Sequence, residues 1–381
     1  MTTAAKPFDI DALLDASSII VCCGSGGVGK TTTSAALALR AAERGRRVCV
    51  LTIDPARRLA QSMGLTELDN APRHVSAVDD TNGGSLDAMM LDMKRTFDEI
   101  VLTHSDPERA KQILSNPFYV SLSSSFAGTQ EYMAMEKLGQ LKAMKSWDLI
   151  VVDTPPSRSA LDFLDAPQRL GRFLDGRMIR MLLAPAKAGG RGMMKVFTVG
   201  LNMFTSVLTR ILGAQALKDL SLFVASLETM FGGFRERADQ TYRLLKEPGT
   251  AFVVVAVPER DALREAAYFV ERLAAERMPL AGLVLNRVHT TNAPGLSVER
   301  SLAAAESLDA SGQSPLAAGV LRVHAERLAA AARDGRMAER FRSAHPGVPV
   351  VEVAAQSTDV HDLDGLRVIG TGLATAQPAT A

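Results

Sequence analysis

The sequence predicts an α/β fold in which a mostly parallel sheet is flanked by helices. Three largely apolar runs, at Ser18–Cys23, Arg47–Ile53 and Asp148–Asp153, lead to this prediction. Strands without polar alternation are buried on both faces, which is typical of a parallel sheet covered by helices on each side. Further strands are expected at Leu86–Leu91, Ala251–Val257, Ala281–Asn286 and Val350–Val353.

A glycine-rich stretch, Gly24–Thr31, follows the first strand and precedes a helix that reaches about Arg40. It reads GSGGVGKT and fits the pattern GxxxxGK[ST] of a P-loop. Glycines let backbone N–H groups turn toward phosphate oxygens, and the positive end of the helix points to the same place. The alternative is an ordinary glycine-rich turn between a strand and a helix. The residues expected to hold phosphate are Gly26, Gly27, Val28, Gly29, Lys30, Thr31 and Thr32.

Within this P-loop NTPase pattern, two residues have specific expected roles. Lys30 would reach the β- and γ-phosphates, and the Thr31 hydroxyl would bind Mg²⁺. Asp153 ends an apolar strand, as does the acid that completes the Mg²⁺ shell in P-loop proteins. Asp54 also ends a strand, at the edge of a parallel sheet where ligands bind. Alternatively, Asp54 caps a helix and Asp153 only terminates its strand.

The helices that complete the α/β pattern are assigned from apolar spacing and from turn residues. Loops are expected at Asp69–Ser85 and Leu308–Ser314. We divide the chain into an N-terminal extension (1–16), a single P-loop domain (17–372) and a disordered tail (373–381). The predicted helices are Ala56–Met63, Met93–Thr103, Pro107–Leu114, Thr129–Lys145, Asp261–Glu276, Ser297–Ser307, Pro315–Arg333 and one from about Asp359.

The region 170–246 contains no strand-like run and is predicted to be a helical insertion in the P-loop domain. Within it, Val196–Thr209 is a run of uncharged residues between Lys195 and Arg210. The run is too short to span a bilayer, which needs about 20 apolar residues. It is either a core helix of a helical subdomain or an apolar surface that meets a hydrophobic client or a membrane.

Composition limits the classes of partner. The chain has 381 residues with a net charge of +1, so it has no global attraction to nucleic acid or to an anionic membrane. Its three cysteines, Cys22, Cys23 and Cys49, lie in apolar runs without metal-binding spacing. We therefore expect buried thiols, no disulfide and no zinc. No apolar secretory signal is visible in residues 1–15, which favours a cytoplasmic protein.

Four segments occur in an order that resembles the ArsA/Get-type ATPases, the arsenical-pump and tail-anchored-protein-targeting family. They are the P-loop, Asp54-Pro55-Ala56, Asp153-Thr154-Pro155-Pro156 and Leu283-Val284-Leu285-Asn286. The resemblance covers roughly residues 17–370 and is greatest to the actinobacterial branch, within the deviant Walker A class of P-loop proteins.

The resemblance implies hydrolysis of ATP, with Mg²⁺, by a dimer that opens and closes with the nucleotide. It also implies that Asp54 activates the attacking water, that Asp153 lies near Mg²⁺ and that Asn286 reads adenine. Position 289 is His, so the NKxD guanine signature is missing and ATP is preferred to GTP.

Two departures from the family pattern affect the expected function. Ser25 stands where the family has a lysine that crosses the dimer to the partner's phosphates. A cation supplied in this way can be worth about 10³–10⁵ in rate, or roughly 4–7 kcal/mol. A homodimer should therefore be slow, unless Arg57, Arg58 or Arg158 substitutes. The second departure is the absence of the cysteines that bind arsenite in some relatives and hold a zinc ion between the subunits of others. This absence argues against an arsenic-pump role and against the eukaryotic targeting assembly.

The leading hypothesis is an ATP-hydrolysing dimeric switch that couples nucleotide state to a helical subdomain. That subdomain would handle a hydrophobic or membrane-linked partner, in the cytoplasm or at the inner face of the membrane. The alternative is a regulatory, nearly inactive nucleotide-binding subunit, paired with a related ATPase that keeps the lysine. A cargo positioner on DNA, similar to ParA, ranks below both because the sequence shows no basic patch.

Overall fold

The computed structural model describes residues 8–54, 58–117, 119–120, 123, 129–155, 236–291, 293, 295–312 and 314–375. The chain divides into two compact units. The first, here called the sheet unit, comprises residues 1–90, 141–161 and 244–381. The second, the helical unit, comprises residues 91–140 and 162–243. Most of the predicted helical insertion, residues 170–235, lies outside the described residues, so that insertion stays a prediction.

The sheet unit is built on eight strands in the order β3-β4-β2-β5-β1-β6-β7-β8. All neighbouring strands are parallel except β3 and β4, which confirms the predicted α/β fold with a mostly parallel sheet. The strands are β1 (Ile19–Cys23), β2 (Arg47–Thr52), β3 (Arg73–His74), β4 (Ser85–Met90), β5 (Leu149–Asp153), β6 (Thr250–Ala256), β7 (Leu280–Val288) and β8 (Val350–Ala354).

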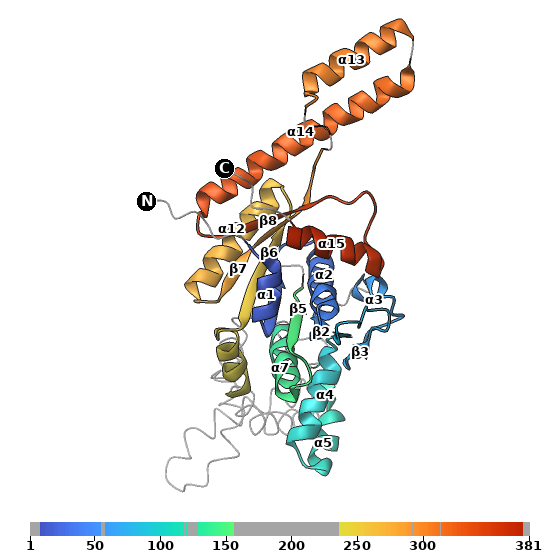
Figure 1. Ribbon diagram of the computed structural model, residues 1–381. Helices are drawn as coiled ribbons and strands as arrows, with labels where there is room; N and C mark the ends of the chain where they lie inside the picture. Colours follow the sequence, from blue (N-terminus) through green and yellow to red (C-terminus); the bar gives the residue numbers. More distant parts are fainter. Residues whose placement is uncertain are drawn as a thin grey trace, which may run out of the picture. The chain divides into compact units, whose positions relative to one another are not determined.

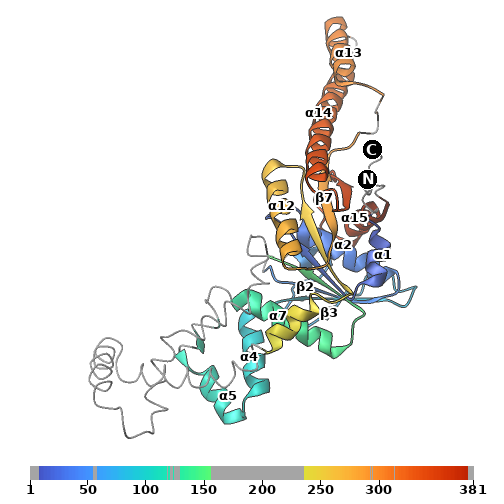
Figure 2. The same ribbon diagram turned by 90° about the vertical axis from the view of Figure 1, so that its left-hand side faces the viewer.

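Helices cover both faces of this sheet (Figures 1 and 2). Alternate side chains of the strands pack into one core cluster with α1 (Ile10–Ala16), α2 (Lys30–Glu43) and α15 (Leu363–Thr375). On the opposite face, α12 (Arg260–Ala275) packs on β6 and β7. Burial on both faces explains why the central strands are apolar throughout. All three cysteines are buried in the strands, as predicted, and burial raises the pKa of Cys22 to about 12.

Several predicted boundaries in the sheet unit are wrong. The predicted loop 69–85 contains the two-residue strand β3, which is too short to show a period of alternation. The predicted helix 56–63 is α3 (Arg58–Ser62) among the described residues. The last helix, α15, begins at residue 363 rather than 359 and continues to residue 375. It therefore enters the predicted tail 373–381, because its buried Leu373 belongs to the core cluster.

Two long helices after β7 form a hairpin, α13 (Val298–Ser311) and α14 (Pro315–Ala344), which extends beyond the sheet (Figures 1 and 2). The predicted loop 308–314 is wrong because α13 continues to Ser311 and ends at Gly312, whose φ of 63° suits glycine. The prediction also ended α14 at residue 333. The helix continues through Asp334, whose buried carboxylate accepts bonds from the backbone N–H and the ring of His289.

The helical unit contains α4 (Met93–His104), α5 (Pro107–Leu114) and most of α7 (Thr129–Met144), close to the predicted ranges. Asp92 and Asp106 cap α4 and α5 by accepting backbone N–H groups of the first turn. Two ion pairs involve buried side chains of α7: Lys137 with Glu99 at 2.7 Å and Glu136 with Arg237 at 2.9 Å. Across the described parts of both units, no helix is both long enough and apolar enough to span a bilayer.

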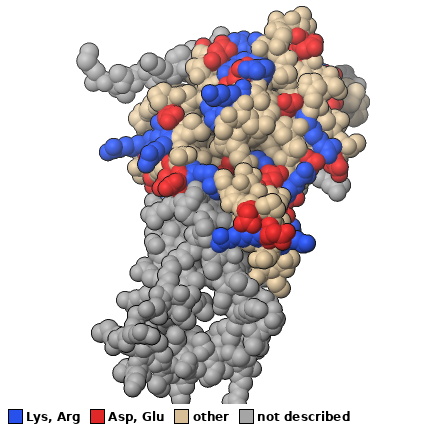
Figure 3. Space-filling model, turned by 90° about the horizontal axis from the view of Figure 1, so that it is seen from below, with Lys and Arg blue, Asp and Glu red and all other residues tan. Residues whose placement is uncertain are grey.

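The face drawn in Figure 3 shows mixed charge. Lysine and arginine side chains of the described residues lie among aspartates and glutamates there, without gathering into an area of one sign. Mixed charge of this kind gives little long-range attraction for a polyanion.

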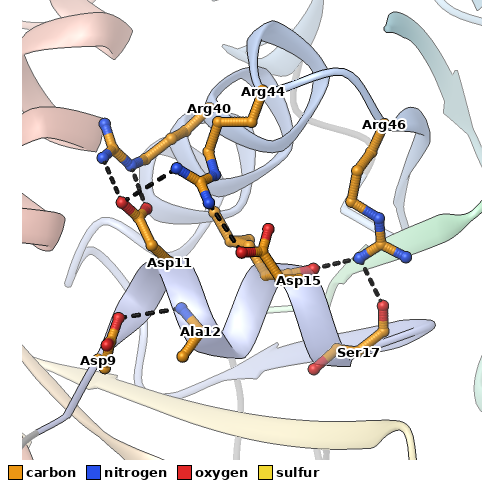
Figure 4. Close-up of polar contacts among 9 residues, drawn as sticks. Asp9, Asp11, Ala12, Asp15, Ser17, Arg40, Arg44 and Arg46 are labelled. Atoms are coloured by element: carbon orange, nitrogen blue, oxygen red, sulfur yellow. Dashed lines mark hydrogen bonds and ion pairs between the residues drawn. The ribbon is translucent and has the colours of Figure 1, made fainter.

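The predicted N-terminal extension, residues 1–16, contains a helix that the sequence did not reveal (Figure 4). Helix α1 is only seven residues long, and Asp9 caps it by accepting from Ala12 N at 2.9 Å. Asp11 accepts two bonds from Arg40 of α2, at 2.6 and 2.8 Å. These contacts fix α1 against the helix that follows the P-loop.

Arg46 joins α1 to the sheet (Figure 4). Its guanidinium donates to the backbone carbonyls of Leu14 and Ser17, just before β1, and to that of Asp148, just before β5. One cation therefore satisfies three carbonyls from segments that are far apart in the sequence. Such partly buried acceptors are costly to leave without a donor.

We expect Arg46→Ala to lower the free energy of unfolding by about 2–4 kcal/mol, because three carbonyls lose a charged donor. The matched control is Arg47→Ala, since Arg47 is exposed and pairs only with the partly exposed Asp148 in the described structure. The control should change stability far less, as exposed ion pairs contribute little. Urea unfolding of both variants measures the difference; equal losses would contradict the role assigned to Arg46.

Candidate nucleotide site

The P-loop connects β1 to α2 at the carboxyl edge of the sheet. Gly24 follows β1 so closely beside β6 that a Cβ there would lie 2.1 Å from the carbonyl oxygen of Val255. Gly26 and Gly27 are exposed, whereas Val28 is buried. Gly29, at φ 94°, is the N-cap of α2. The predicted loop is thus in place, with its backbone turning into the positive end of a fourteen-residue helix.

Lys30 is folded over this loop. Its Nζ donates to the carbonyl oxygen of Ser25 at 2.7 Å, and the residue is only 6% exposed. Burial lowers the pKa of Lys30, while the negative charges of Asp153 and Asp54 oppose that shift. The ammonium therefore lies at the loop and within electrostatic reach of both acids that the sequence singled out.

Asp153 links the carboxyl ends of β5 and β2 to the start of α2. Its Oδ2 accepts from the Thr31 hydroxyl at 2.8 Å and from the Thr52 hydroxyl at 2.9 Å. Thr31 lies in the first turn of α2, which follows β1 and the P-loop. Thr52 ends β2, and Asp153 ends β5, which lies between β1 and β2 in the sheet. The carboxylate is fully buried, and burial raises its pKa from 3.8 to about 6.

Asp54 lies just beyond β2. Its backbone N–H donates to the Thr52 hydroxyl at 3.2 Å, so one threonine contacts the segments of both acids. The charge of Asp54 contributes to the raised pKa of Asp153. Residues 55–57 and Arg158, and the side chain of Arg58, lie outside the described residues. The arginines that could replace the missing lysine are therefore not placed.

A cavity of about 760 Å³ opens beside the P-loop. Asn286, at the end of β7, lines it and donates from its amide to the carbonyl oxygen of Val28 at 2.9 Å. The remaining wall comes largely from the segment between β8 and α15. The lining residues include Gly29, Thr31, Thr32, Gln61, Ser62, Asn286, Arg287, Ala354, Ala355, Gln356, Ser357, Thr358, Asp359, Val360, His361 and Ile369.

The residues present fit a magnesium nucleotide. Asp153 Oδ1 is buried and has no hydrogen-bond partner among the described residues, and it belongs to a carboxylate that the Thr31 hydroxyl already contacts. A hard cation favours such oxygen donors. Glycines keep the phosphate side of the loop free of side chains, and the cavity adjoins Thr31 and Thr32. The structure thus brings together the predicted residues Gly26–Thr32, Asp54, Asp153 and Asn286, although their roles stay predictions.

Two parts of this site were missed from the sequence. Thr52 ends a strand without belonging to any motif, and only the sheet order shows that it contacts Asp153. The cavity wall from Ala354 to His361 lies about 330 residues after the P-loop in the chain, in a polar segment without a recognisable pattern. For both Thr52 and the cavity wall, the signal available in the sequence was a strand end followed by polar residues, because ligands bind at the carboxyl ends of parallel strands.

The model of the anion-transporting ATPase family matches residues 17–295 of the chain. The chain belongs to this ArsA-type ATPase family. The match begins just before β1 and ends after β7, so it includes the P-loop, Asp54, Asp153 and Asn286.

Curated relatives support this membership. ATPase GET3 of Malassezia globosa is 27% identical over 288 residues, which cover 74% of this chain and 77% of that protein. ATPase get3 of Schizosaccharomyces pombe is 28% identical over 286 residues, covering 74% and 77%. Protein Rv2184c of Mycobacterium tuberculosis is 32% identical over 164 residues, covering 40% of this chain and 38% of its own length.

The buried carboxylate leads to a prediction about stability. The pKa of Asp153 is raised from 3.8 to about 6, so the folded protein holds this proton more tightly than the unfolded chain. Stability should therefore fall as pH rises through that window. Without metal or nucleotide, Asp153→Asn should be more stable than the wild type by about 2–3 kcal/mol near pH 7, and equally stable below about pH 4. Urea unfolding in EDTA tests this; a difference that does not change with pH would contradict it.

Proposed function

We propose that this chain binds Mg·ATP at the P-loop and hydrolyses it to ADP and phosphate. The observation that carries the proposal is the contact between the Thr31 hydroxyl and Asp153, whose second carboxylate oxygen has no partner in the part of the chain that the structure describes. Membership of an ATPase family and the cavity beside Thr31 and Thr32 support it.

The proposed binding step uses groups that the fold already orients. Backbone N–H groups of Gly26–Thr32 and the N-terminus of α2 face the phosphates, and Lys30 exchanges its bond to Ser25 for the β- and γ-phosphates. Thr31 and Asp153 hold Mg²⁺, which when bound neutralises phosphate charge. Asn286, which lines the cavity, would contact the adenine.

The proposed hydrolytic step depends on Asp54. A carboxylate at the end of β2, near Lys30 and Asp153, is suited to orient water toward the γ-phosphate and to take up its proton. The neighbouring Thr52 hydroxyl holds the backbone of Asp54 through its N–H group. Asp54 is thus a proposed catalytic residue, whereas Thr52 is a positioning residue.

Single-turnover hydrolysis of ATP tests this assignment. Asp54→Asn should slow the chemical step by about 10²–10⁴-fold while leaving the affinity for Mg·ATP within a few-fold of wild type, because a general base acts after binding. Equal rates for wild type and variant would remove Asp54 from the chemistry. Loss of binding as well as rate would instead assign it a role in holding the nucleotide.

We propose further that the chain acts as a dimer with low activity by itself. Ser25 carries no charge to offer a partner's phosphates, and a cation at such a position can be worth about 10³–10⁵ in rate. A related subunit that keeps the lysine would restore the rate in a heterodimer. The same residue supports the alternative function, a regulatory subunit with almost no hydrolysis, and quantitative turnover separates the two.

Ser25→Lys should raise the turnover of the purified chain by at least about tenfold if a missing cation limits it. Ser25→Gln is the matched control, since it adds length without charge. An increase in the lysine variant alone supports the proposal. Equal turnover in both variants would show that position 25 does not limit hydrolysis.

The output of the proposed switch is the helical insertion at about 170–246. Its uncharged run, residues 196–209, would contact a hydrophobic client or a membrane surface when nucleotide closes the dimer. The proposal rests on the sequence, because residues 170–235 lie outside the described residues. The cytoplasm and the inner face of the membrane are the proposed sites of action.

A further inference from the structure

A bulge in β7 sets the direction of the Asn286 side chain. Between Leu285 and Val288 the register against β8 shifts, so that β7 carries one more residue than its neighbour. Arg287, at the bulge, has φ 57°, a left-handed conformation that is uncommon outside glycine. Its backbone N–H donates to Asn286 Oδ1 at 2.9 Å. The bulge therefore fixes which way the carboxamide faces.

The other end of that carboxamide holds the P-loop. Asn286 Nδ2 donates to the carbonyl oxygen of Val28 at 2.9 Å, and the residue is only 8% exposed. The orientation of the amide is determined, because Val28 needs a donor and the N–H of Arg287 needs an acceptor. One side chain thus links two backbone segments that are 258 residues apart.

Gly29 fits against the same amide. A Cβ at Gly29 would lie 2.3 Å from Asn286 Nδ2, which is closer than a Cβ atom comes to another heavy atom in proteins. Gly29 is the N-cap of α2, and the first N–H groups of a helix are available to bind an anion such as phosphate. Any movement of the Asn286 amide would therefore change the part of the loop that grips phosphate.

The other end of the segment 286–289 is also fixed, by contacts of His289. The backbone N–H and the ring Nδ1 of His289 both contact Asp334 Oδ2, at 2.8 and 2.7 Å, and Asp334 is buried in α14. Residues 286–289 are therefore held between the P-loop and the helical hairpin. A support fixed at both ends can hold the loop before any nucleotide arrives.

We propose that Asn286 is a positioning residue for the P-loop, which keeps Val28 and Gly29 in the phosphate-binding conformation whatever base the nucleotide carries. This role is additional to contact with adenine. It rests on the proposed nucleotide site, but it also predicts an effect on the P-loop in the protein without ligand. An experiment can therefore contradict one proposal without contradicting the other.

Hydrogen exchange of the nucleotide-free protein tests the first consequence. Asn286→Asp keeps the shape and the acceptor for Arg287 but cannot donate to Val28 at neutral pH. Asn286→Ala removes the donor without adding a charge, in case the carboxylate prevents folding. Both variants should raise amide exchange in residues 24–31 by about tenfold, as expected when a buried hydrogen bond is lost.

Asn82→Asp is the matched control. Asn82 also donates its amide to a backbone carbonyl, that of Glu43 at 2.7 Å, but this carbonyl lies at the far end of α2 from the P-loop. This variant should leave exchange in residues 24–31 unchanged. Exchange at the wild-type rate in both Asn286 variants would overturn the proposal, as would an equal increase in the Asn82 variant.

A ligand without a base separates positioning from adenine recognition. Calorimetry should show that Asn286→Ala weakens binding of Mg·tripolyphosphate by about tenfold, and binding of Mg·ATP by at least as much because the contact with adenine is lost as well. A loss confined to Mg·ATP would overturn the proposal and leave Asn286 as a reader of the base alone. If wild type bound neither ligand, the proposed function would be wrong. The hydrogen-exchange experiment would still test whether Asn286 positions the P-loop.

Discussion

A carboxylate buried at the end of the central strand β5 is the constraint on which the site depends. Asp153 is fully buried, and its charge would be costly there without donors. The Thr31 hydroxyl, from the first turn of α2, and the Thr52 hydroxyl, from the end of β2, supply them. This arrangement requires the order β2-β5-β1 at the middle of a parallel sheet. Fold and site are therefore set by the same topology.

The other charges of the site are arranged around that carboxylate. Lys30 is almost as buried as Asp153 and lies within electrostatic range of it and of Asp54. Two acids and one ammonium in a region of low dielectric leave net negative charge close to the P-loop. A divalent cation bound between these acids and a polyphosphate would reduce the repulsion between them. The site is therefore suited to metal and nucleotide together, rather than to either alone.

The parts of this structure that follow from local chemistry could be predicted from the sequence. The P-loop is a strand, a glycine turn and a helix in sequence, so Gly24–Thr31 could be assigned from the chain alone. The central strands could be predicted from their apolar runs, which are also local features of the sequence. Asp54 and Asp153 could be chosen as candidates because acids at the ends of parallel strands meet at one edge.

Other features depend on contacts between distant segments, which no local pattern records. Helix α1 has too few residues to show a period and is held by ion pairs with α2. The role of Thr52 follows from sheet order, and the contact of Asn286 with Val28 spans 258 residues. Helix α14 continues past its predicted end at residue 333, and the next residue, Asp334, is buried and accepts from His289, which lies 45 residues earlier in the chain.

The central claim is that Thr31 and Asp153 hold the metal that accompanies ATP. Isothermal titration calorimetry with ATP, in Mg²⁺ and in EDTA, tests it most directly when wild type is compared with Thr31→Val. We predict that Mg²⁺ tightens ATP binding to wild type by at least about tenfold and that the variant loses this dependence. Wild-type affinity that is the same with and without Mg²⁺, or an unchanged metal dependence in the variant, would contradict the account.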